Sequence, residues 1–210
     1  MITIALAKGR LAQQTIEIFE KAGVDCSCVD TKSRKLVFTD QTNGYRFILV
    51  KPSDVPTYVD RGVADIGVVG KDTLLEAGLP LYEMVDLRCG VCRLCVCGPK
   101  SAQKRMVTDA NLRVATKYAN VATEYYREQG VTIDVIRLNG SVELGPVLGL
   151  SDVILDIVES GKTLIENGLE VKDELFAISA RLVVNRVSLK LKKDAIGRLV
   201  ENVREVVNDD

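Results

Sequence analysis

Two glycine-containing stretches combine residue types that could hold a phosphate group. Lys8-Gly9-Arg10 places two cations around a glycine, directly after a short apolar segment. Asp152–Leu164, DVILDIVESGKTL, interrupts an apolar run with Asp156 and continues with Ser160-Gly161-Lys162-Thr163. Arginine grips phosphate oxygens with two hydrogen bonds, and lysine supplies a point charge. Small residues before a helix expose backbone N–H groups, and a helix N-terminus favours an anion. Both stretches therefore have the chemistry of an anion site.

The second stretch has the layout of a site for a phosphorylated sugar. Its unbroken apolar run predicts a strand buried on both faces, which we expect to end at Asp156. There the carboxylate could accept hydrogen bonds from ribose hydroxyls, while the loop before a helix opening at Thr163 holds the phosphate. It is not a Walker loop, because Asp156 stands where the first glycine is required. The alternative is an ordinary buried strand and a capped helix.

Three further residues are candidates for a nucleotide site. Arg34 begins an extended segment and could add a third cation to Lys8 and Arg10. Asp72 follows a buried strand, as Asp156 does, and such carboxylates could bind ribose hydroxyls, an adenine amine or a magnesium ion carried by a diphosphate. Tyr118 follows another strand and could stack on a base. The alternative for Tyr118 is a rim position with no ligand.

Catalysis that depends on histidine is excluded, because the chain contains none. Ser-His-Asp and Cys-His mechanisms, histidine metal sites and histidine proton shuttles are therefore absent. Any chemistry must proceed without the commonest general base.

Four of the six cysteines cluster in RCGVCRLCVCGP, at positions 89, 92, 95 and 97. The start of this run resembles the C-x2-C-x2-C spacing of iron–sulfur proteins, but the fourth spacing does not fit. The apolar residues between the cysteines are typical of a strand, and free cysteine is among the most buried residue types. Buried strand cysteines are the favoured interpretation, and a metal site is the alternative.

Composition favours a cytoplasmic globular protein. The 210 residues carry a formal net charge of −1 and a pI near 5.7, so no basic excess indicates nucleic acid or an anionic membrane as partner. No apolar window is long enough to span a bilayer, and MITIALAKGR lacks the pattern of a secretory signal.

Alternating strand and helix patterns predict an α/β protein. We expect strands at 2–7, 34–39, 45–50, 65–69, 112–117 and 132–138, with a hairpin turn at Asn43-Gly44. Residues 174–184 are expected to form one strand and 187–207 one long helix with apolar residues at i, i+3 and i+4.

A faint internal repeat predicts two similar lobes. The two copies are Gly62–Leu79 and Gly149–Leu169. In each copy a glycine and an aspartate precede an apolar run, and Gly-Lys then begins a predicted helix that ends in Gly-Leu. We expect lobe I to comprise residues 1–86 and 184–210 and lobe II residues 87–183, each built from right-handed βαβ units. Ligands are expected in a cleft between the lobes. Chance similarity of two common βα turns is the alternative.

These motifs together resemble the short form of the ATP phosphoribosyltransferase family. The resemblance is collinear over nearly the whole chain, and its carriers are Ala5–Arg10, Ser33–Leu36, Asp54–Val59, Ala64–Asp72, Ala115–Ala122, Leu138–Leu144, Asp152–Leu164 and Ser179–Asn185. It implies two lobes of periplasmic-binding-protein type II-like architecture. It also implies transfer of the phosphoribosyl group from phosphoribosyl pyrophosphate to N1 of ATP, which releases pyrophosphate and begins histidine biosynthesis.

The resemblance also implies roles for individual residues. Lys8, Arg10 and Arg34 would serve catalysis near the pyrophosphate and the ATP phosphates, and Asp72 and Tyr118 would lie near the nucleotide. The residues implied to bind phosphoribosyl pyrophosphate are Asp156, Glu159, Ser160, Gly161, Lys162 and Thr163. Many relatives carry smaller residues at the positions of Glu159 and Lys162, which implies a backbone role there.

The resemblance further implies the cofactor and the partners. Mg²⁺ would arrive with the substrates and not in a protein metal site. This chain would form a homodimer and join a regulatory subunit related to histidyl-tRNA synthetase in a hetero-octamer. A cytoplasmic two-lobe binding module without enzymatic activity is the competing hypothesis, and the number of cations and hydroxyls in both lobes favours the enzyme.

Overall fold

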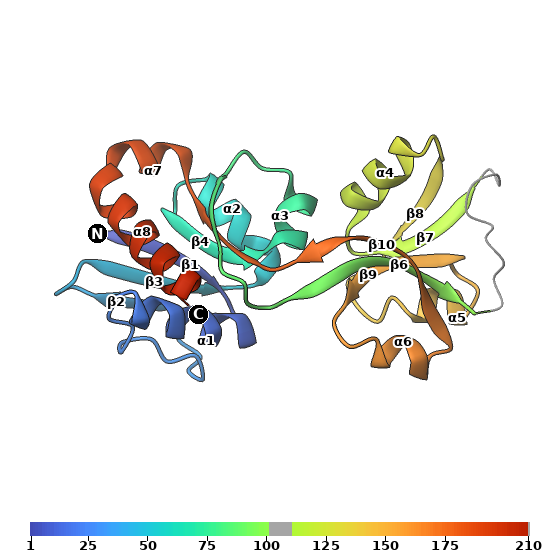
Figure 1. Ribbon diagram of the computed structural model, residues 1–210, viewed down its shortest axis with the longest axis horizontal. Coiled ribbons are helices and arrows are strands. Elements are labelled where there is room, and N and C mark those ends of the chain that lie inside the picture. The colour runs from blue at the N-terminus through green and yellow to red at the C-terminus, as the bar shows by residue number, and fades with distance from the viewer. Residues whose placement is uncertain (101–110, 210) are drawn as a thin grey trace. The chain divides into compact units, whose positions relative to one another are not determined.

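The computed structural model describes residues 1–100 and 111–209. The chain forms two compact units (Figure 1). Unit 1 comprises Met1–Gly90 and Ser179–Asp210, and unit 2 comprises Val91–Ile178. Each unit contains one mixed β-sheet with helices on both faces.

The sheet of unit 1 is built around three parallel strands. Its strands are β1 (Ile2–Ala7), β2 (Val37–Asp40), β3 (Tyr45–Val50), β4 (Ile66–Gly70), β5 (Tyr82–Asp86) and β11 (Ala180–Val184). They lie in the order β2-β3-β1-β4-β11-β5. β1 pairs in parallel with β3 and β4, whereas β2 and β11 pair antiparallel with their neighbours. β1 and β4 are almost wholly buried, which explains their unbroken apolar sequences.

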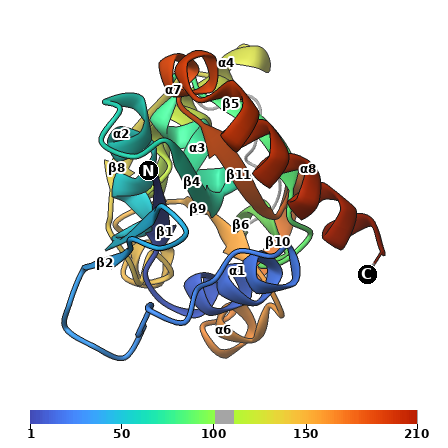
Figure 2. The same ribbon diagram turned by 90° about the vertical axis from the view of Figure 1, so that its left-hand side faces the viewer.

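Helices cover both faces of this sheet. They are α1 (Arg10–Lys21), the 3-10 turn η1 (Pro52–Asp54), α2 (Val55–Asp60), α3 (Lys71–Ala77), α7 (Arg186–Leu191) and α8 (Lys193–Asp209). α1 and α8 lie on one face, where Phe19 and Ile196 pack against Ile4 of β1, and α2 and α3 lie on the other (Figure 2). The apolar stripe of α8 is buried at Ile196, Leu199, Val200, Val203 and Val207.

Unit 2 repeats this plan. Its strands are β6 (Cys92–Pro99), β7 (Leu112–Thr116), β8 (Ile133–Arg137), β9 (Val153–Val158) and β10 (Leu169–Ile178), and its helices are α4 (Ala119–Glu128), α5 (Leu144–Val147) and α6 (Lys162–Glu166). The strand order is β10-β6-β9-β7-β8. α4 packs on one face through Ala122 and Tyr126, and Leu164 of α6 packs on the other.

The two sheets share one topology. In unit 1, β3, β1 and β4 are parallel, and β11 follows antiparallel; in unit 2, β8, β7 and β9 are parallel, and β6 follows antiparallel. The two copies of the sequence repeat form β4 with α3 and β9 with α6. The predicted pair of similar α/β lobes is therefore confirmed.

Two long elements predicted from the sequence are each divided in two. The predicted strand at 174–184 is β10 and β11, which are interrupted at Ser179 because β10 pairs with β6 in unit 2 and β11 with β4 in unit 1. The predicted helix at 187–207 is α7 and α8, which are separated at Lys192. The Lys192 ammonium group bonds both carboxylate oxygens of Asp65, at 2.8 and 2.7 Å, and this tertiary anchor holds the break in place.

Two strand boundaries also differ from expectation. β9 does not end at Asp156 but continues to Val158, because Asp156 pairs in register with Cys95 of the antiparallel strand β6. β2 begins at Val37, so Arg34 precedes it in an exposed bend. In that bend the backbone N–H of Lys35 donates to the Ser33 hydroxyl, which stabilises a turn in place of a strand.

Three of the four clustered cysteines are part of the sheet of unit 2, and Cys89 belongs to unit 1. Cys92, Cys95 and Cys97 lie in β6, and Cys95 and Cys97 are fully buried, which confirms the strand interpretation for these two. Burial raises the pKa of the Cys97 thiol to about 12, so this thiol stays protonated and unreactive. All six cysteines are free thiols.

Across residues 1–100 and 111–209, no helix combines the length and apolarity needed to cross a membrane.

Candidate functional site

The cations of Lys8-Gly9-Arg10 lie where the central strand of unit 1 ends. The backbone N–H of Lys8 donates to the carbonyl of Val50, the last residue of β3, at 2.8 Å. Gly9 has φ 123° and ψ −154°, a conformation open to glycine but strained for other residues. This turn starts α1 at Arg10 and leaves Lys8 and Arg10 exposed at the carboxyl end of the parallel strands. Open α/β sheets bind their ligands at this end.

Arg34 lies near the same edge of the sheet, although β2 starts three residues after it. β2 runs antiparallel to β3, and the Leu36 carbonyl accepts from the N–H of Leu49 at 2.8 Å. The start of β2 is therefore level with the end of β3, two strands and about 10 Å from β1. Arg34 is exposed there.

Lys71 and Asp72 follow β4 at the same edge. Asp72 occupies the first turn of α3 and is 8% exposed, and a carboxylate there interacts favourably with the helix N-terminus. A Cβ atom at Gly70 would lie 2.2 Å from the Asp72 Oδ1 atom, so glycine is required for the carboxylate to fold back over the chain. Asp72 and Asp156 are not equivalent, contrary to expectation, because Asp72 lies in a helix and Asp156 in a strand.

The site residues predicted from the sequence do not include Lys51, and Lys71 belongs to them only as part of the repeat. Lys51 follows β3 directly and is exposed, and Lys71 begins α3 directly after β4. The pattern that could have found them is a lysine placed immediately after a buried apolar strand. With Lys8 they give each of the three parallel strands of unit 1 a lysine at its carboxyl end. This edge therefore concentrates positive charge.

In unit 2, the stretch that contains Asp156 forms β9, a loop and α6. Asp156 is half-buried and lies on the same face of the sheet as Ile154 and Val158, since side chains alternate along a strand. Ile154 and Val158 pack in one cluster with Leu164 of α6, so Asp156 and α6 share a face. α6 starts at Lys162, one residue before the predicted start.

The loop between β9 and α6 ends at a glycine in the left-handed conformation. Gly161 has φ 73° and ψ 2° and is the N-cap of α6. Glu159, Ser160, Lys162 and Thr163 around it are exposed. The N–H groups of the first helical turn have no acceptor within the helix, so an anion could accept from them.

Thr116 links this strand to the turn after β7. Its hydroxyl donates to the carbonyl of Leu155 at 2.6 Å and accepts from the N–H of Tyr118 at 2.8 Å, and the side chain is fully buried. The backbone ladder between β7 and β9 pairs only Val114 with Val153 and Ala115 with Ile154. The hydroxyl of Thr116 therefore continues the connection to the residue beside Asp156. Thr116 is not among the site residues predicted from the sequence.

Tyr118 is not at the rim of the sheet. It is 2% exposed and packs in the core under α4, and the Lys117 ammonium group lies 4.7 Å from the centroid of its ring. A ring covered in this way has a packing role, and its position does not support the prediction that it stacks on a base.

The carboxylates of the described residues do not gather into a metal site. No group of three or more cysteine, aspartate or glutamate side chains among them is placed to hold an ion. The two candidate carboxylates are in different units, Asp72 in unit 1 and Asp156 in unit 2.

Comparison with known proteins gives consistent matches over the whole chain. The family model described as "HisG: ATP phosphoribosyltransferase" matches residues 51–205. An ATP phosphoribosyltransferase of Lachnospira eligens is 54% identical over 208 residues, which cover 98% of this chain and 96% of that protein. A chain from the ATP phosphoribosyl transferase (HisG:HisZ) complex of Thermotoga maritima is 37% identical with a TM-score of 0.87, and the match covers 100% of both chains.

A more distant likeness concerns the fold alone. The periplasmic aliphatic sulphonate binding protein SsuA of Escherichia coli is 13% identical with a TM-score of 0.59, and the match covers 98% of this chain and 72% of that one. The chain thus has the predicted periplasmic-binding-protein-like architecture.

Proposed function

The chain belongs to the ATP phosphoribosyltransferase family, and we propose that it divides its two substrates between its two units. It is a pentosyltransferase that joins C1 of phosphoribosyl pyrophosphate to N1 of ATP with release of pyrophosphate, the first step of histidine biosynthesis. Unit 1 binds ATP and the pyrophosphate, and unit 2 binds the ribose 5-phosphate part of the donor. The observation that carries this assignment is the set of cations at the carboxyl edge of unit 1, Lys8, Arg10 and Arg34.

In unit 2, Asp156 accepts hydrogen bonds from the ribose hydroxyls of the donor. The backbone N–H groups of the loop from Glu159 to Thr163 surround the 5′-phosphate, and Gly161 allows the close approach of the chain. The shared face of Asp156 and α6 supports this division, because a ribose and its phosphate are neighbours in the substrate. Asp72 serves the nucleotide in unit 1. Tyr118 of unit 2 is assigned to the nucleotide by the family resemblance alone, since its ring is buried.

The reaction requires no general base, which agrees with the absence of histidine. N1 of adenine carries a free lone pair and attacks C1 without losing a proton. As the bond from C1 to the pyrophosphate oxygen breaks, positive charge develops on the ribose and negative charge on the leaving group. Lys8, Arg10 and Arg34 stabilise that negative charge, so catalysis rests on positioning and electrostatics.

Mg²⁺ enters this scheme as part of the substrates. Phosphate oxygens of a diphosphate or triphosphate are hard ligands that bind Mg²⁺ with retained water. We therefore assign the ion to the substrate phosphates and not to a dedicated protein site.

The partner is a regulatory subunit of the HisZ type, as in the Thermotoga maritima complex. Homodimerisation of this chain and assembly into a hetero-octamer follow from the family resemblance. We also propose a cytoplasmic location.

The test is a transferase assay with a pair of matched variants. ATP, phosphoribosyl pyrophosphate and Mg²⁺ are mixed with the chain, with and without its regulatory subunit, and the ultraviolet absorbance of the product is followed. Asp156→Asn should raise the KM for phosphoribosyl pyrophosphate by about tenfold or more and leave the KM for ATP unchanged. Asp152→Asn is the control, because it makes the same chemical change before the start of β9. No product from the wild-type complex would reject the activity, and equal effects of both variants would reject the role of Asp156.

A further inference from the structure

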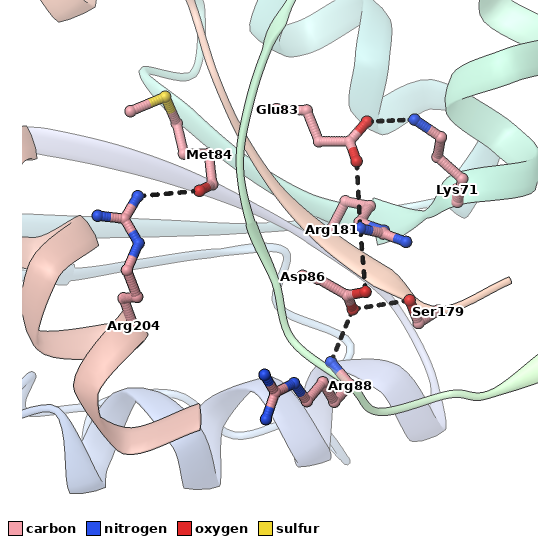
Figure 3. A network of polar contacts seen from close by, with 8 residues as sticks. All are labelled: Lys71, Glu83, Met84, Asp86, Arg88, Ser179, Arg181 and Arg204. Carbon is pink, nitrogen blue, oxygen red and sulfur yellow. Dashed lines mark hydrogen bonds and ion pairs between the residues drawn. The ribbon is translucent and has the colours of Figure 1, made fainter. Parts of the chain in front are cut away.

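A row of alternating charges in unit 1 links Lys71, which follows the carboxyl end of β4, to side chains of β5 and β11 (Figure 3). The Lys71 Nζ atom is 2.5 Å from the Glu83 Oε2 atom. The other carboxylate oxygen of Glu83 is 3.3 Å from a guanidinium nitrogen of Arg181, and the same nitrogen is 3.0 Å from the Asp86 Oδ2 atom. Two cations and two anions therefore alternate from Lys71 of α3 through Glu83 of β5 and Arg181 of β11 to Asp86, which is again on β5.

At one end of this row of charges, Asp86 accepts two further hydrogen bonds. The Asp86 Oδ1 atom accepts from the Ser179 hydroxyl at 2.7 Å and from the backbone N–H of Arg88 at 2.9 Å (Figure 3). Burial disfavours the charge of Asp86, but these two hydrogen bonds and the guanidinium group of Arg181 outweigh it and hold the pKa of the carboxyl below its usual range. Asp86 therefore stays ionised and anchors Arg181.

At the other end of the row, Lys71 is held in place through its backbone. Lys71 directly follows β4, and its backbone N–H donates to the carbonyl of Ser179 at 3.0 Å. Its position matches that of Lys162 in the repeat, where Gly161-Lys162 begins the helix after β9. An isolated surface ion pair gains little because two long side chains must be ordered. Here Glu83 is already ordered by Arg181, so Lys71 can be held at a lower entropic cost.

The ammonium group of Lys71 keeps donors available for a ligand. A lysine ammonium has three N–H donors, and Glu83 accepts from one of them. The side chains of Lys71 and Glu83 are 30% and 32% exposed, so a phosphate group can reach this ammonium. Lys71 shares its edge of the sheet with Lys8 and Lys51.

We propose that Glu83, held by Arg181, is a positioning residue that fixes the Lys71 ammonium group where it contacts a phosphate of a substrate. This inference rests on the proposed function, because it assigns phosphates to the carboxyl edge of unit 1. Glu83 does not touch the substrate and acts only through Lys71.

A double-mutant cycle on the full chain in complex with its regulatory subunit tests this inference. Glu83→Gln keeps the shape and removes the charge, and Lys71→Met removes the ammonium group. Each should raise the KM for ATP or for phosphoribosyl pyrophosphate about tenfold while kcat stays within about twofold. The variant that carries both should be no worse than Lys71→Met alone, because Glu83 has no other route to the substrate. The substrate whose KM changes identifies the phosphate.

Glu174→Gln is the matched control, since Glu174 pairs with Arg93 at 2.7 Å in unit 2, on β10 and β6. It should leave both KM values unchanged. Calorimetric affinities for ATP and for inorganic pyrophosphate are measured on the same proteins, and at least one of the two should weaken about tenfold in Glu83→Gln. These affinities keep the test valid if the wild type transfers no phosphoribosyl group. Unchanged or tighter binding by Glu83→Gln, or additive losses in the double variant, would overturn the positioning role.

Discussion

Asp65 and Asp152 make the same backbone bonds in the two units. A carboxylate oxygen of Asp65 accepts from the N–H of Thr3 at 2.8 Å, and that of Asp152 accepts from the N–H of Arg113 at 3.0 Å. In return, the N–H of Asp65 donates to the carbonyl of Thr3, and the N–H of Asp152 to the carbonyl of Arg113. Each aspartate therefore joins the start of the third parallel strand to the first strand. The repeated aspartate of the sequence fixes strand register and lies at the end of the sheet opposite the candidate site.

The two aspartates differ in the cation that they bind. The Asp65 side chain is 7% exposed and bonds Lys192 at the junction of α7 and α8. The Asp152 side chain is 37% exposed and bonds Arg113, which belongs to the adjacent strand β7. Asp65 therefore ties a distant segment of the chain to the sheet, whereas Asp152 ties only neighbouring strands.

Asp65→Asn should lower the free energy of unfolding by about 2 kcal/mol, because a buried charge pair loses one partner. Asp152→Asn should lower it by about 1 kcal/mol or less, because its ion pair is partly solvated. Urea denaturation followed by circular dichroism measures both. A larger loss in Asp152→Asn would contradict this ranking.

The contribution of Asp65 should depend on pH. Burial raises its pKa, but bonds from Lys192, Ser188 and the N–H of Thr3 outweigh burial, so the folded-state pKa lies below the ordinary value of 3.8. A depressed pKa means that the stabilisation is complete above the unfolded pKa and is lost as pH falls through the folded one. The stability difference between the wild type and Asp65→Asn should therefore be constant near neutral pH and shrink below about pH 4. A difference that grows on acidification would refute the assignment.

Thr116→Val should destabilise unit 2 by about 2 kcal/mol, because the Leu155 carbonyl and the Tyr118 N–H lose their buried partner. Valine has nearly the same shape, so the loss measures the hydroxyl. Thr116→Ser restores the hydroxyl and should recover most of the stability. Thermal unfolding of the three proteins is the measurement, and a larger loss in Thr116→Ser than in Thr116→Val would show that packing of the methyl group matters more than the hydroxyl.

Arg10→Ala and Arg34→Ala should each lower kcat by about a hundredfold and weaken ATP binding by less than about tenfold, because the charge of the leaving group develops in the transition state. Steady-state kinetics and equilibrium binding of ATP separate the two effects. Arg127→Ala is the control, since Arg127 is exposed on α4 and pairs with Glu124. Unchanged turnover in either test variant would reject its role at the leaving group.

Local sequence patterns alone predicted several strands, a turn and a helix of this protein. The apolar runs of β1 and β4, the turn at Asn43-Gly44 and the apolar stripe of α8 are properties of a few consecutive residues, so they could be read directly. The repeat and the collinear motifs determined the two similar lobes and the family. The candidate loops at Lys8-Gly9-Arg10 and Ser160–Thr163 were selected because glycine beside cations or hydroxyls after a buried strand makes an exposed turn that can approach an anion.

The tertiary structure decided what depends on a partner far along the chain. The division at Ser179 arises because β10 and β11 pair in different sheets, and local periodicity does not contain that choice. The break at Lys192 depends on Asp65, which lies 127 residues away. Tyr118 lies in the core because α4 covers it, although the residue before it, Lys117, is charged and exposed. Sequence periodicity thus records which residues are apolar, whereas pairing and packing decide which edge or face each residue occupies.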